Sequence, residues 1–268
     1  MRGTPGRIAD YTCTMKWHVL GSYGGSSPTC RTTSFVINDE LALDAGSITQ
    51  ALPIDGQRRI RRIVLSHSHL DHTASIPFFI ENIFAEQREP VEILLTPETY
   101  LAIKNHLFNN DTWPDFTRIP SDLLPALRLV EVASGRPFDA NGLRLTPIPV
   151  RHTVPTHGFF VDDGSSVVLF TSDTGPTEAI WRVANATPRL RAVIVEVSFP
   201  NRMQAVADVS CHLTPQTLCT ELEKLKRPVP VYLYHLKPGY LDELREELAE
   251  TRFSAAVQEL EQGRIYTL

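Results

Sequence analysis

The 268-residue sequence lacks several features that would place it in a specialised class of protein. No apolar run reaches the roughly 18 residues that a membrane-spanning helix needs, so we expect no transmembrane segment. The four cysteines form neither a CxxC pair nor the dense pattern of a small disulfide-stabilised domain. Positive charge is not in excess, since 26 Lys and Arg stand against 31 Asp and Glu and the net charge is −5. Domains that bind nucleic-acid duplexes are usually basic, so this balance does not favour that class.

The N-terminus also lacks an apolar stretch of the kind found in secretory signals. Residues 1–14 carry arginines, glycines and a proline, and the first strand-like pattern begins at Met15. Because scattered cysteines in a chain of this length are typical of reduced thiols, we expect a cytoplasmic protein. We predict that residues 1–14 are a disordered extension. No linker divides the rest of the chain, so residues 15–268 are predicted to form a single domain.

What the sequence does contain is a series of short apolar strands mixed with helical patterns. We expect strands at Trp17–Leu20, Ser34–Ile37, Leu41–Asp44, Ile63–Leu65, Val91–Leu95, Leu129–Val132, Leu143–Val150, Phe159–Val161, Val167–Thr171, Ala192–Val197 and Val229–Tyr234. We expect helices at Thr73–Ile83, Glu98–His106, Pro176–Ala184, Pro215–Leu225, Leu241–Ala249 and Ala255–Gln262. Strict alternation of strand and helix is absent, which favours an α/β (α+β) fold of stacked sheets between helices.

Histidine is the residue type that carries chemical information. Residues 66–72, Ser-His-Ser-His-Leu-Asp-His, follow the apolar strand Ile63–Leu65 directly. His67 and His69 are two positions apart in an extended segment, so both rings are expected on one side of the chain. Asp71 and His72 follow where the chain turns into a helix and can address a second point nearby. Imidazole and carboxylate donors together favour Zn²⁺, with Mn²⁺ or Fe²⁺ as alternatives.

Further ligand-type residues follow later strands at the point where each strand ends. His152 follows Leu143–Val150, Asp173 follows Val167–Thr171, and His235 follows Val229–Tyr234. A single histidine or turn aspartate of this kind is usually structural. Taken with the first cluster, however, these residues predict a metal site at one rim of the sheets.

This set of residues resembles the five-motif pattern of the metallo-β-lactamase-fold hydrolase superfamily. The resemblance implies an αββα four-layer sandwich that holds two divalent metal ions at one edge. It implies a first ion held by His67, His69 and His152 with Asp173 bridging, a second held by Asp71, His72, Asp173 and His235, and a supporting carboxylate at Asp44. A hydroxide between the two ions is then the expected nucleophile.

Within that superfamily, a second group of motifs resembles class II 3′,5′-cyclic-nucleotide phosphodiesterases. The motifs are Thr33-Ser34-Phe35, Arg151–Pro155 with Gly158-Phe159, Glu196–Pro200, His212–Pro215 and Tyr234–Pro238. The resemblance implies hydrolysis of a cyclic nucleotide to the nucleoside 5′-monophosphate. His212 is not needed as a ligand, and we expect it to protonate the departing oxygen, with Asp71 as the other catalytic residue.

Four further positions are interpreted as supporting the site or contacting substrate, namely Asp44, His157, Glu196 and Thr214. His157 competes with His152 for one ligand role, but His152 directly follows its strand. Cys211 stands where the family carries glycine, and cysteine enters a positive φ less cheaply than glycine does. No residue is recognisable as a selector of adenine or guanine.

Other readings of the same ligands remain open. A transfer-RNA 3′-processing endonuclease shares the ligand set, but the charge of −5 does not favour an RNA partner. A di-iron oxidoreductase of the same fold would use similar ligands, and a metal-binding module without activity is a further alternative. We therefore expect a small cyclic-nucleotide substrate, no membrane or nucleic-acid partner, and leave a homodimer open.

Overall fold

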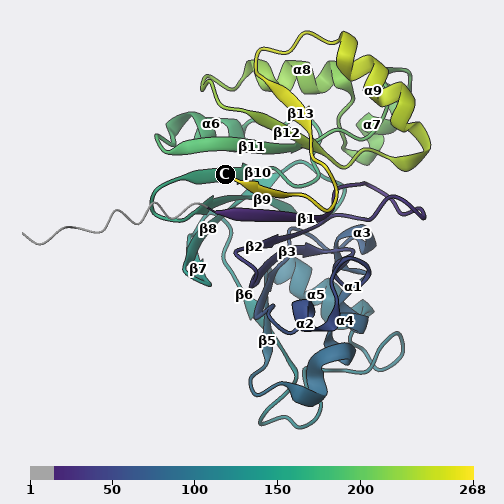
Figure 1. Ribbon diagram of the computed structural model, residues 1–268, viewed down its shortest axis with the longest axis vertical. Helices are drawn as coiled ribbons and strands as arrows, with labels where there is room; N and C mark the ends of the chain where they lie inside the picture. Colours follow the sequence, from purple (N-terminus) through teal and green to yellow (C-terminus); the bar gives the residue numbers. More distant parts are fainter. Residues whose placement is uncertain (1–14) are drawn as a thin grey trace, which may run out of the picture.

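Two seven-stranded β-sheets face each other and carry helices on their outer sides (Figure 1). The computed structural model describes residues 15–268. One sheet has the order β14-β1-β2-β3-β4-β5-β6 and the other β13-β12-β11-β10-β9-β8-β7. This arrangement confirms the predicted αββα sandwich. The extension expected at residues 1–14 lies outside the described residues, and the single domain over residues 15–268 stays a prediction.

The first sheet combines the N-terminal half of the chain with its last strand. Its strands are β1 (Lys16–Gly21), β2 (Ser34–Ile37), β3 (Leu41–Ala45), β4 (Arg62–Val64), β5 (Val91–Leu95), β6 (Leu127–Glu131) and β14 (Ile265–Thr267). Strands β3 to β6 pair in parallel, whereas β1 pairs antiparallel with both β2 and β14. The C-terminal strand therefore protects one edge of the sheet that the N-terminal half builds.

The second sheet is formed by the C-terminal half. Its strands are β7 (Phe138–Ala140), β8 (Leu143–Val150), β9 (Thr156–Asp162), β10 (Val167–Phe170), β11 (Leu190–Glu196), β12 (Val231–Tyr234) and β13 (Val257–Glu259). Strands β10 to β13 run parallel, and β7 to β10 pair antiparallel. The carboxyl ends of β10, β11 and β12 consequently lie at one rim of this sheet.

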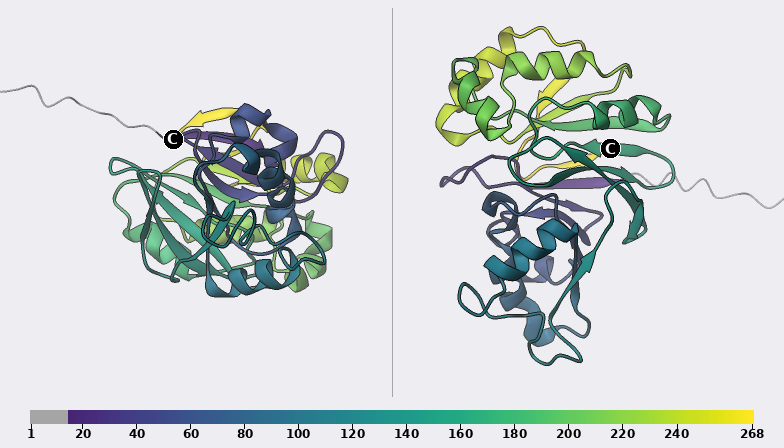
Figure 2. Two further views of the ribbon diagram at one scale, coloured as in Figure 1. Left: turned by 90° about the horizontal axis from the view of Figure 1, so that it is seen from below. Right: turned by 180° about the vertical axis from the view of Figure 1, so that it is seen from behind.

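Helices cover each sheet on the side away from the other sheet, as the two views of Figure 2 show. The helices of the first half are α1 (Ile48–Ala51), α2 (Ile54–Gln57), α3 (Leu70–Thr73), α4 (Ile76–Ile83), η1 (Phe84–Glu86) and α5 (Pro97–His106). Those of the second half are α6 (Ala179–Ala186), η2 (Asn201–Met203), α7 (Gln204–Ser210), α8 (Pro215–Glu223), η3 (Pro238–Tyr240) and α9 (Leu241–Glu250). Within residues 15–268, none of the helices combines the length and apolar character that crossing a membrane requires.

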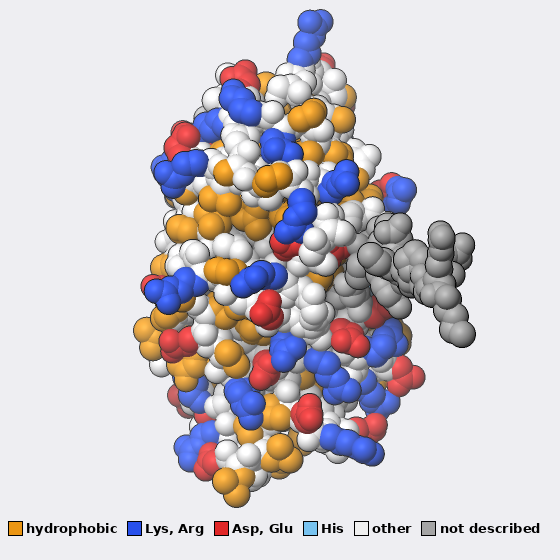
Figure 3. All heavy atoms as spheres, turned by 90° about the vertical axis from the view of Figure 1, so that its left-hand side faces the viewer, with side chains coloured by type: hydrophobic (Ala, Val, Ile, Leu, Met, Phe, Trp, Pro, Cys, Tyr) orange, Lys and Arg blue, Asp and Glu red, His pale blue; other side chains and the backbone are white. Residues whose placement is uncertain are grey.

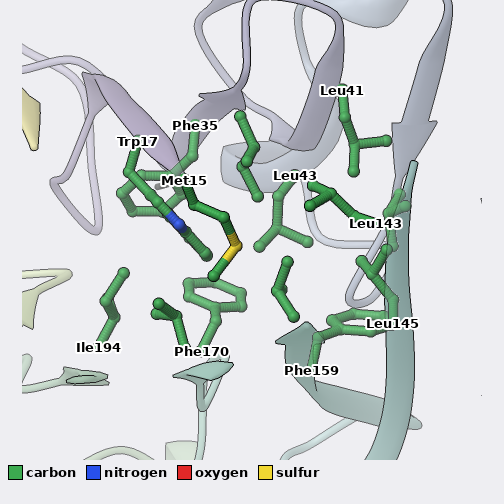
Figure 4. Close-up of a cluster of buried hydrophobic side chains, with 14 of the residues drawn as sticks. Met15, Trp17, Phe35, Leu41, Leu43, Leu143, Leu145, Phe159, Phe170 and Ile194 are labelled. Atoms are coloured by element: carbon green, nitrogen blue, oxygen red, sulfur yellow. The ribbon is translucent and has the colours of Figure 1, made fainter. Parts of the chain in front are cut away.

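The central core lies between the two sheets. Trp17 and Phe35 from the first sheet, together with Met15 just before β1, face Phe159 and Phe170 from the second, and all five side chains are buried (Figure 4). Phe35 makes an edge-to-face ring contact with Phe170 at 5.5 Å between centroids. Because both sheets contribute to one packed layer, their rims are held in a fixed relation to each other.

One predicted helix is wrong. Residues 255–262 were expected to be helical, but Val257–Glu259 forms β13, which pairs in parallel with β12. Exposure alternates residue by residue from Phe253 to Glu259, which is the period of a strand. The Ala, Gln and Glu content favours a helix locally, but pairing with the edge of β12 overrides that preference.

The predicted helix Thr73–Ile83 is divided in the structure. Helix α3 ends at Thr73 and α4 begins at Ile76, with Pro77 in the first turn of α4. Proline is tolerated in the first turn of a helix because a backbone N–H at that position would have no acceptor within the helix. Helix α7 was not predicted, although it leads directly to Cys211 and His212.

Candidate metal centre

Seven of the residues that the sequence singled out converge at the rim where the two sheets meet. Their ligand-type atoms form two main groups, each with all atoms within 4.8 Å of one another: His67, His69 and His152 in one, and Asp71, His72, Asp173 and His235 in the other. The first group lacks only Asp173 from the expected set, and Asp173 Oδ2 lies 3.9 Å from His67 Nε2. The second group has the four expected members.

The first cluster is positioned by the end of a buried parallel strand and the start of a helix. After β4 the chain continues to His69, which is the N-cap residue of α3 with extended backbone angles. Asp71 and His72 then lie in the short α3, and the ring of His72 lies against that of His67 with 4.2 Å between centroids. This change from strand to helix geometry lets four residues of one short segment contribute to two neighbouring groups.

Each of four buried or half-buried histidines has its Nδ1 atom held, which fixes the direction of Nε2. His72 donates to Asp44 at 2.7 Å, and His152 donates to the carbonyl of Cys211 at 3.1 Å. His67 and His235 donate to the hydroxyls of Ser66 and Ser198, at 3.0 and 2.8 Å. These hydroxyls can accept because they donate their own protons to Asp44 and Glu196. Such outer hydrogen bonds select the tautomer that a metal-ligating histidine needs.

The donor atoms suit divalent metal ions. The Nε2 atoms of His67 and His72 are fully buried and have no hydrogen-bond partner within residues 15–268. A buried polar atom without a partner is costly, and ligation would satisfy it. Asp173 Oδ2 lies 3.3 Å from His72 Nε2 and 3.1 Å from His235 Nε2, which places a carboxylate between the two groups. Histidine nitrogen with a few carboxylate oxygens is a donor set typical of zinc.

The electrostatics show how strongly these side chains interact. Burial alone would lower the pKa of His72, but Asp173 and Asp44 raise it well above its ordinary value. Burial would raise the pKa of Asp173, but His235 and His72 hold it well below its usual range. Burial lowers the pKa of His152 to about 4, so this ring is neutral and able to ligate at neutral pH.

Asp44 accepts hydrogen bonds from the segment of residues 66–72. It is fully buried in β3 and accepts hydrogen bonds from the backbone N–H and the hydroxyl of Ser66, both at 2.8 Å, as well as from His72. The three hydrogen bonds tie the carboxylate to both ends of the 66–72 segment. From the sequence, Asp44 is interpreted as a supporting carboxylate, and that role stays a prediction.

His212 lies beside the two groups and is held by Glu196. Its Nδ1 atom donates to Glu196 Oε1 at 2.8 Å, and its ring stacks on that of His235 with 5.1 Å between centroids. Glu196 is fully buried at the end of β11 and also accepts from the backbone N–H of Thr174. The hydrogen bond at Nδ1 leaves Nε2 of His212 as the atom that can exchange a proton with a substrate.

The other two sequence candidates have different surroundings. His157 lies in β9, where its Nε2 is 2.9 Å from the hydroxyl of Ser134, and it belongs to neither main group. Thr214 is the N-cap of α8 and forms a capping box with Thr217.

Sequence reasoning did not identify Ser66 and Ser198, because their importance depends on which histidines the fold brings beside them.

Three residues at the site have positive φ although they are not glycine. Asp44 has φ 56°, Ser172 has φ 58° and His235 has φ 72°. Asp44 is the last residue but one of β3, Ser172 directly precedes Asp173, and His235 directly follows β12, so each left-handed residue lies at or beside a residue of the site. Strained backbone of this kind concentrates at functional sites, where the surrounding packing maintains it.

Cys211 is a fourth such residue, at the C-terminus of α7. It has φ 55° and ψ 56°, which is the left-handed conformation that glycine adopts at low cost. Cys211 therefore adopts the backbone conformation for which glycine is the less costly residue, as its place in the family pattern suggested. The turn still forms, and the carbonyl of Cys211 still reaches His152.

We expect Cys211→Gly to raise the free energy of unfolding by about 0.5–1 kcal/mol, because it removes left-handed strain while costing some chain entropy. Urea denaturation with an unchanged m-value would measure the effect. Cys219→Gly is a matched control, since Cys219 lies inside α8, where glycine is a poorer helix former than cysteine and should destabilise by about 0.3 kcal/mol. A loss of stability in Cys211→Gly would contradict the argument from strain.

Comparison with known proteins gives several similarities across most of the chain. A family model described as "Beta-lactamase superfamily domain" matches residues 42–236. A probable 3′,5′-cyclic-nucleotide phosphodiesterase from Yersinia pestis is 26% identical over 82% of this chain and 78% of its own length. A 3′,5′-cyclic-nucleotide phosphodiesterase from Aliivibrio fischeri is 27% identical over 77% of this chain and 74% of its own length. Ribonuclease Z from Mycolicibacterium gilvum is 26% identical over 76% of each chain.

The solved structure of unliganded yeast PDE1 superposes with a TM-score of 0.81. It covers 95% of this chain and 99% of the other, at 18% sequence identity. At that identity the likeness establishes the fold, and the site must be argued from the residues of this chain.

Proposed function

Because the chain belongs to the metallo-β-lactamase superfamily, whose domain model spans residues 42–236, we propose that it is a metal-dependent phosphodiesterase. Its substrate in this proposal is a 3′,5′-cyclic nucleotide, and its product is the nucleoside 5′-monophosphate. The observation that carries the proposal is the pair His212–Glu196 beside the two groups of metal-type ligands. The two cyclic-nucleotide phosphodiesterases among the relatives support the choice of substrate.

We assign the ligands of two divalent ions from the two groups. The first ion would be held by His67, His69, His152 and Asp173, and the second by Asp71, His72, Asp173 and His235. Zn²⁺ is the proposed metal, with Mn²⁺ or Fe²⁺ as alternatives. When bound, such ions bring the pKa of bound water towards neutrality and offset negative charge on phosphate oxygens.

The proposed role of His212 follows from the chemistry of the leaving group. The 3′ oxygen of a cyclic nucleotide leaves as an alkoxide, which is a poor leaving group unless an acid protonates it. Glu196 accepts from Nδ1 and thereby holds the ring in one orientation, so that a proton on Nε2 can be delivered to the departing oxygen. Glu196 is a positioning residue in this scheme, since it acts through His212.

A small substrate agrees with the charge of the protein better than an RNA does. The net charge is −5, and on the face shown in Figure 3 basic and acidic side chains are interspersed rather than separated. A transfer-RNA-processing endonuclease remains the second candidate, because ribonuclease Z proteins are also among the relatives. That activity would need an RNA-binding surface in addition to the site.

Purified protein supplied with Zn²⁺ should hydrolyse cAMP, cGMP or both, and the product should be the 5′-monophosphate and not the 3′-monophosphate. Chromatographic identification of the product would measure this. The panel should include cyclic dinucleotides, bis-p-nitrophenyl phosphate and a precursor tRNA. Cleavage of the precursor tRNA without hydrolysis of any cyclic mononucleotide would overturn the proposal in favour of the endonuclease.

A further inference from the structure

A cavity of about 680 Å³ is lined at one end by Asp71, which also belongs to the second metal-type group. The loop of residues 25–32 forms one wall, Ser47 and Gln50 line another, and Leu70 and Asp71 lie at the end nearest the metal centre. We call this space the Asp71 cavity. Its volume lies within the range of about 300–1,000 Å³ that is typical of small-molecule sites.

The walls of the Asp71 cavity are held by hydrogen bonds. Gln262 accepts from the backbone N–H of Arg31 at 2.6 Å and donates to the carbonyl of Thr29 at 3.2 Å. The hydroxyl of Ser47 donates to the carbonyl of Thr32 at 2.7 Å. The loop is therefore fixed at three backbone positions, and the cavity is part of the fold.

Two side chains of the cavity lining have hydrogen-bond donors without a partner in residues 15–268. Arg31 uses its Nε atom to donate to the carbonyl of Leu20 at 2.6 Å, and its two terminal nitrogens have no hydrogen-bond partner within residues 15–268. The side-chain oxygen of Gln50 is engaged by the hydroxyls of Ser75 and Thr49, at 3.0 and 3.3 Å. Its amide nitrogen makes no hydrogen bond in the described part of the chain, so Gln50 also acts as a donor.

The two purine bases differ in what they offer to such donors. Guanine presents two acceptors, O6 and N7, side by side, whereas adenine presents an acceptor at N7 and a donor at N6. A guanidinium group matches the guanine edge, and an amide matches adenine only when its own oxygen is free to accept. Leu70, with 69% of its surface exposed, adds an apolar contact for a base or ribose.

We propose that the Asp71 cavity binds the nucleoside of the substrate and selects guanine over adenine through Arg31 and Gln50. The inference rests on the proposed phosphodiesterase function, since it places the rest of the substrate next to the metal centre.

The test compares kcat/KM for cGMP, cAMP and bis-p-nitrophenyl phosphate, which has no base. The wild-type protein should prefer cGMP to cAMP by about tenfold or more. Gln50→Ala and Arg31→Lys should each reduce that preference by about fivefold or more, mainly through KM for cGMP. The ratio of kcat/KM for cGMP to that for bis-p-nitrophenyl phosphate should fall in both variants. Circular dichroism and elemental analysis would show that the variants are folded and loaded with metal.

Gln216→Ala is the matched control, because Gln216 is an exposed residue of α8 that does not line the cavity. It should keep the wild-type preference. Equal efficiency towards cGMP and cAMP, or an unchanged preference in Gln50→Ala, would overturn the inference and leave the phosphodiesterase function standing. Hydrolysis of neither nucleotide by the wild-type protein would overturn both.

Discussion

Asp173→Ala is expected to reduce the bound metal from the proposed two equivalents per chain to one or fewer, and to lower turnover in the proposed phosphodiesterase reaction by at least about 10³-fold. Its Oδ2 atom lies 3.1 Å from His235 Nε2, 3.3 Å from His72 Nε2 and 3.9 Å from His67 Nε2. The carboxylate thus faces ligand atoms of both groups. Its removal leaves the first ion with histidine ligands only and the second with Asp71 as its one carboxylate.

Metal content by elemental analysis and turnover on a cyclic nucleotide would measure the two effects. Asp139→Ala serves as the control, since Asp139 is an exposed carboxylate in β7. Circular dichroism would separate a loss of ligation from a loss of fold. If Asp173→Ala kept two equivalents of metal and normal turnover, Asp173 would not be a shared ligand.

His212→Ala should have the second-largest effect and should depend on the substrate. For a cyclic nucleotide we expect turnover to fall by about 10²–10⁴-fold with no change in metal content. For bis-p-nitrophenyl phosphate the loss should be less than about tenfold, because p-nitrophenolate leaves readily without a proton. Glu196→Gln should also reduce turnover of the cyclic nucleotide more than turnover of bis-p-nitrophenyl phosphate. The reduction should be smaller than in His212→Ala, because the substitution only weakens the hydrogen bond that orients the His212 ring.

This comparison distinguishes an acid from a ligand. His212 also lies within 4.8 Å of ligand-type atoms of His152 and Asp173, and of Glu196 and His235, so a metal-binding role is a definite alternative. An equal loss on both substrates together with loss of metal would assign His212 to the ligands. His106→Ala, which changes an exposed histidine in α5, should leave both activities intact.

The ligand-type residues could be predicted because they carry a local pattern. His67 to His72 lie within one short segment, and His152, Asp173 and His235 each follow an apolar strand. Strand ends are readable from sequence, and parallel strands bring their carboxyl ends to one rim. The convergence of the groups therefore followed from the order of the elements.

The hydrogen bonds around the ligands could not be predicted in the same way. Ser66 and Ser198 are ordinary serines in the sequence, and only the packed structure shows that they hold His67 and His235. Gln50 is a similar case, because its role depends on Ser75, which lies 25 residues away. The misread helix at residues 255–262 has the same cause, since its strand conformation depends on a partner that is distant in sequence.

The two groups of ligands draw on both sheets. His67 and His72 follow a strand of the first sheet, whereas His152, Asp173 and His235 follow strands of the second, the last of them near the end of the chain. A chain that has folded only one sheet holds at most part of each group. The ligand-type residues therefore come together only after both sheets have formed and β12 has joined the second one, so the proposed activity would require that step.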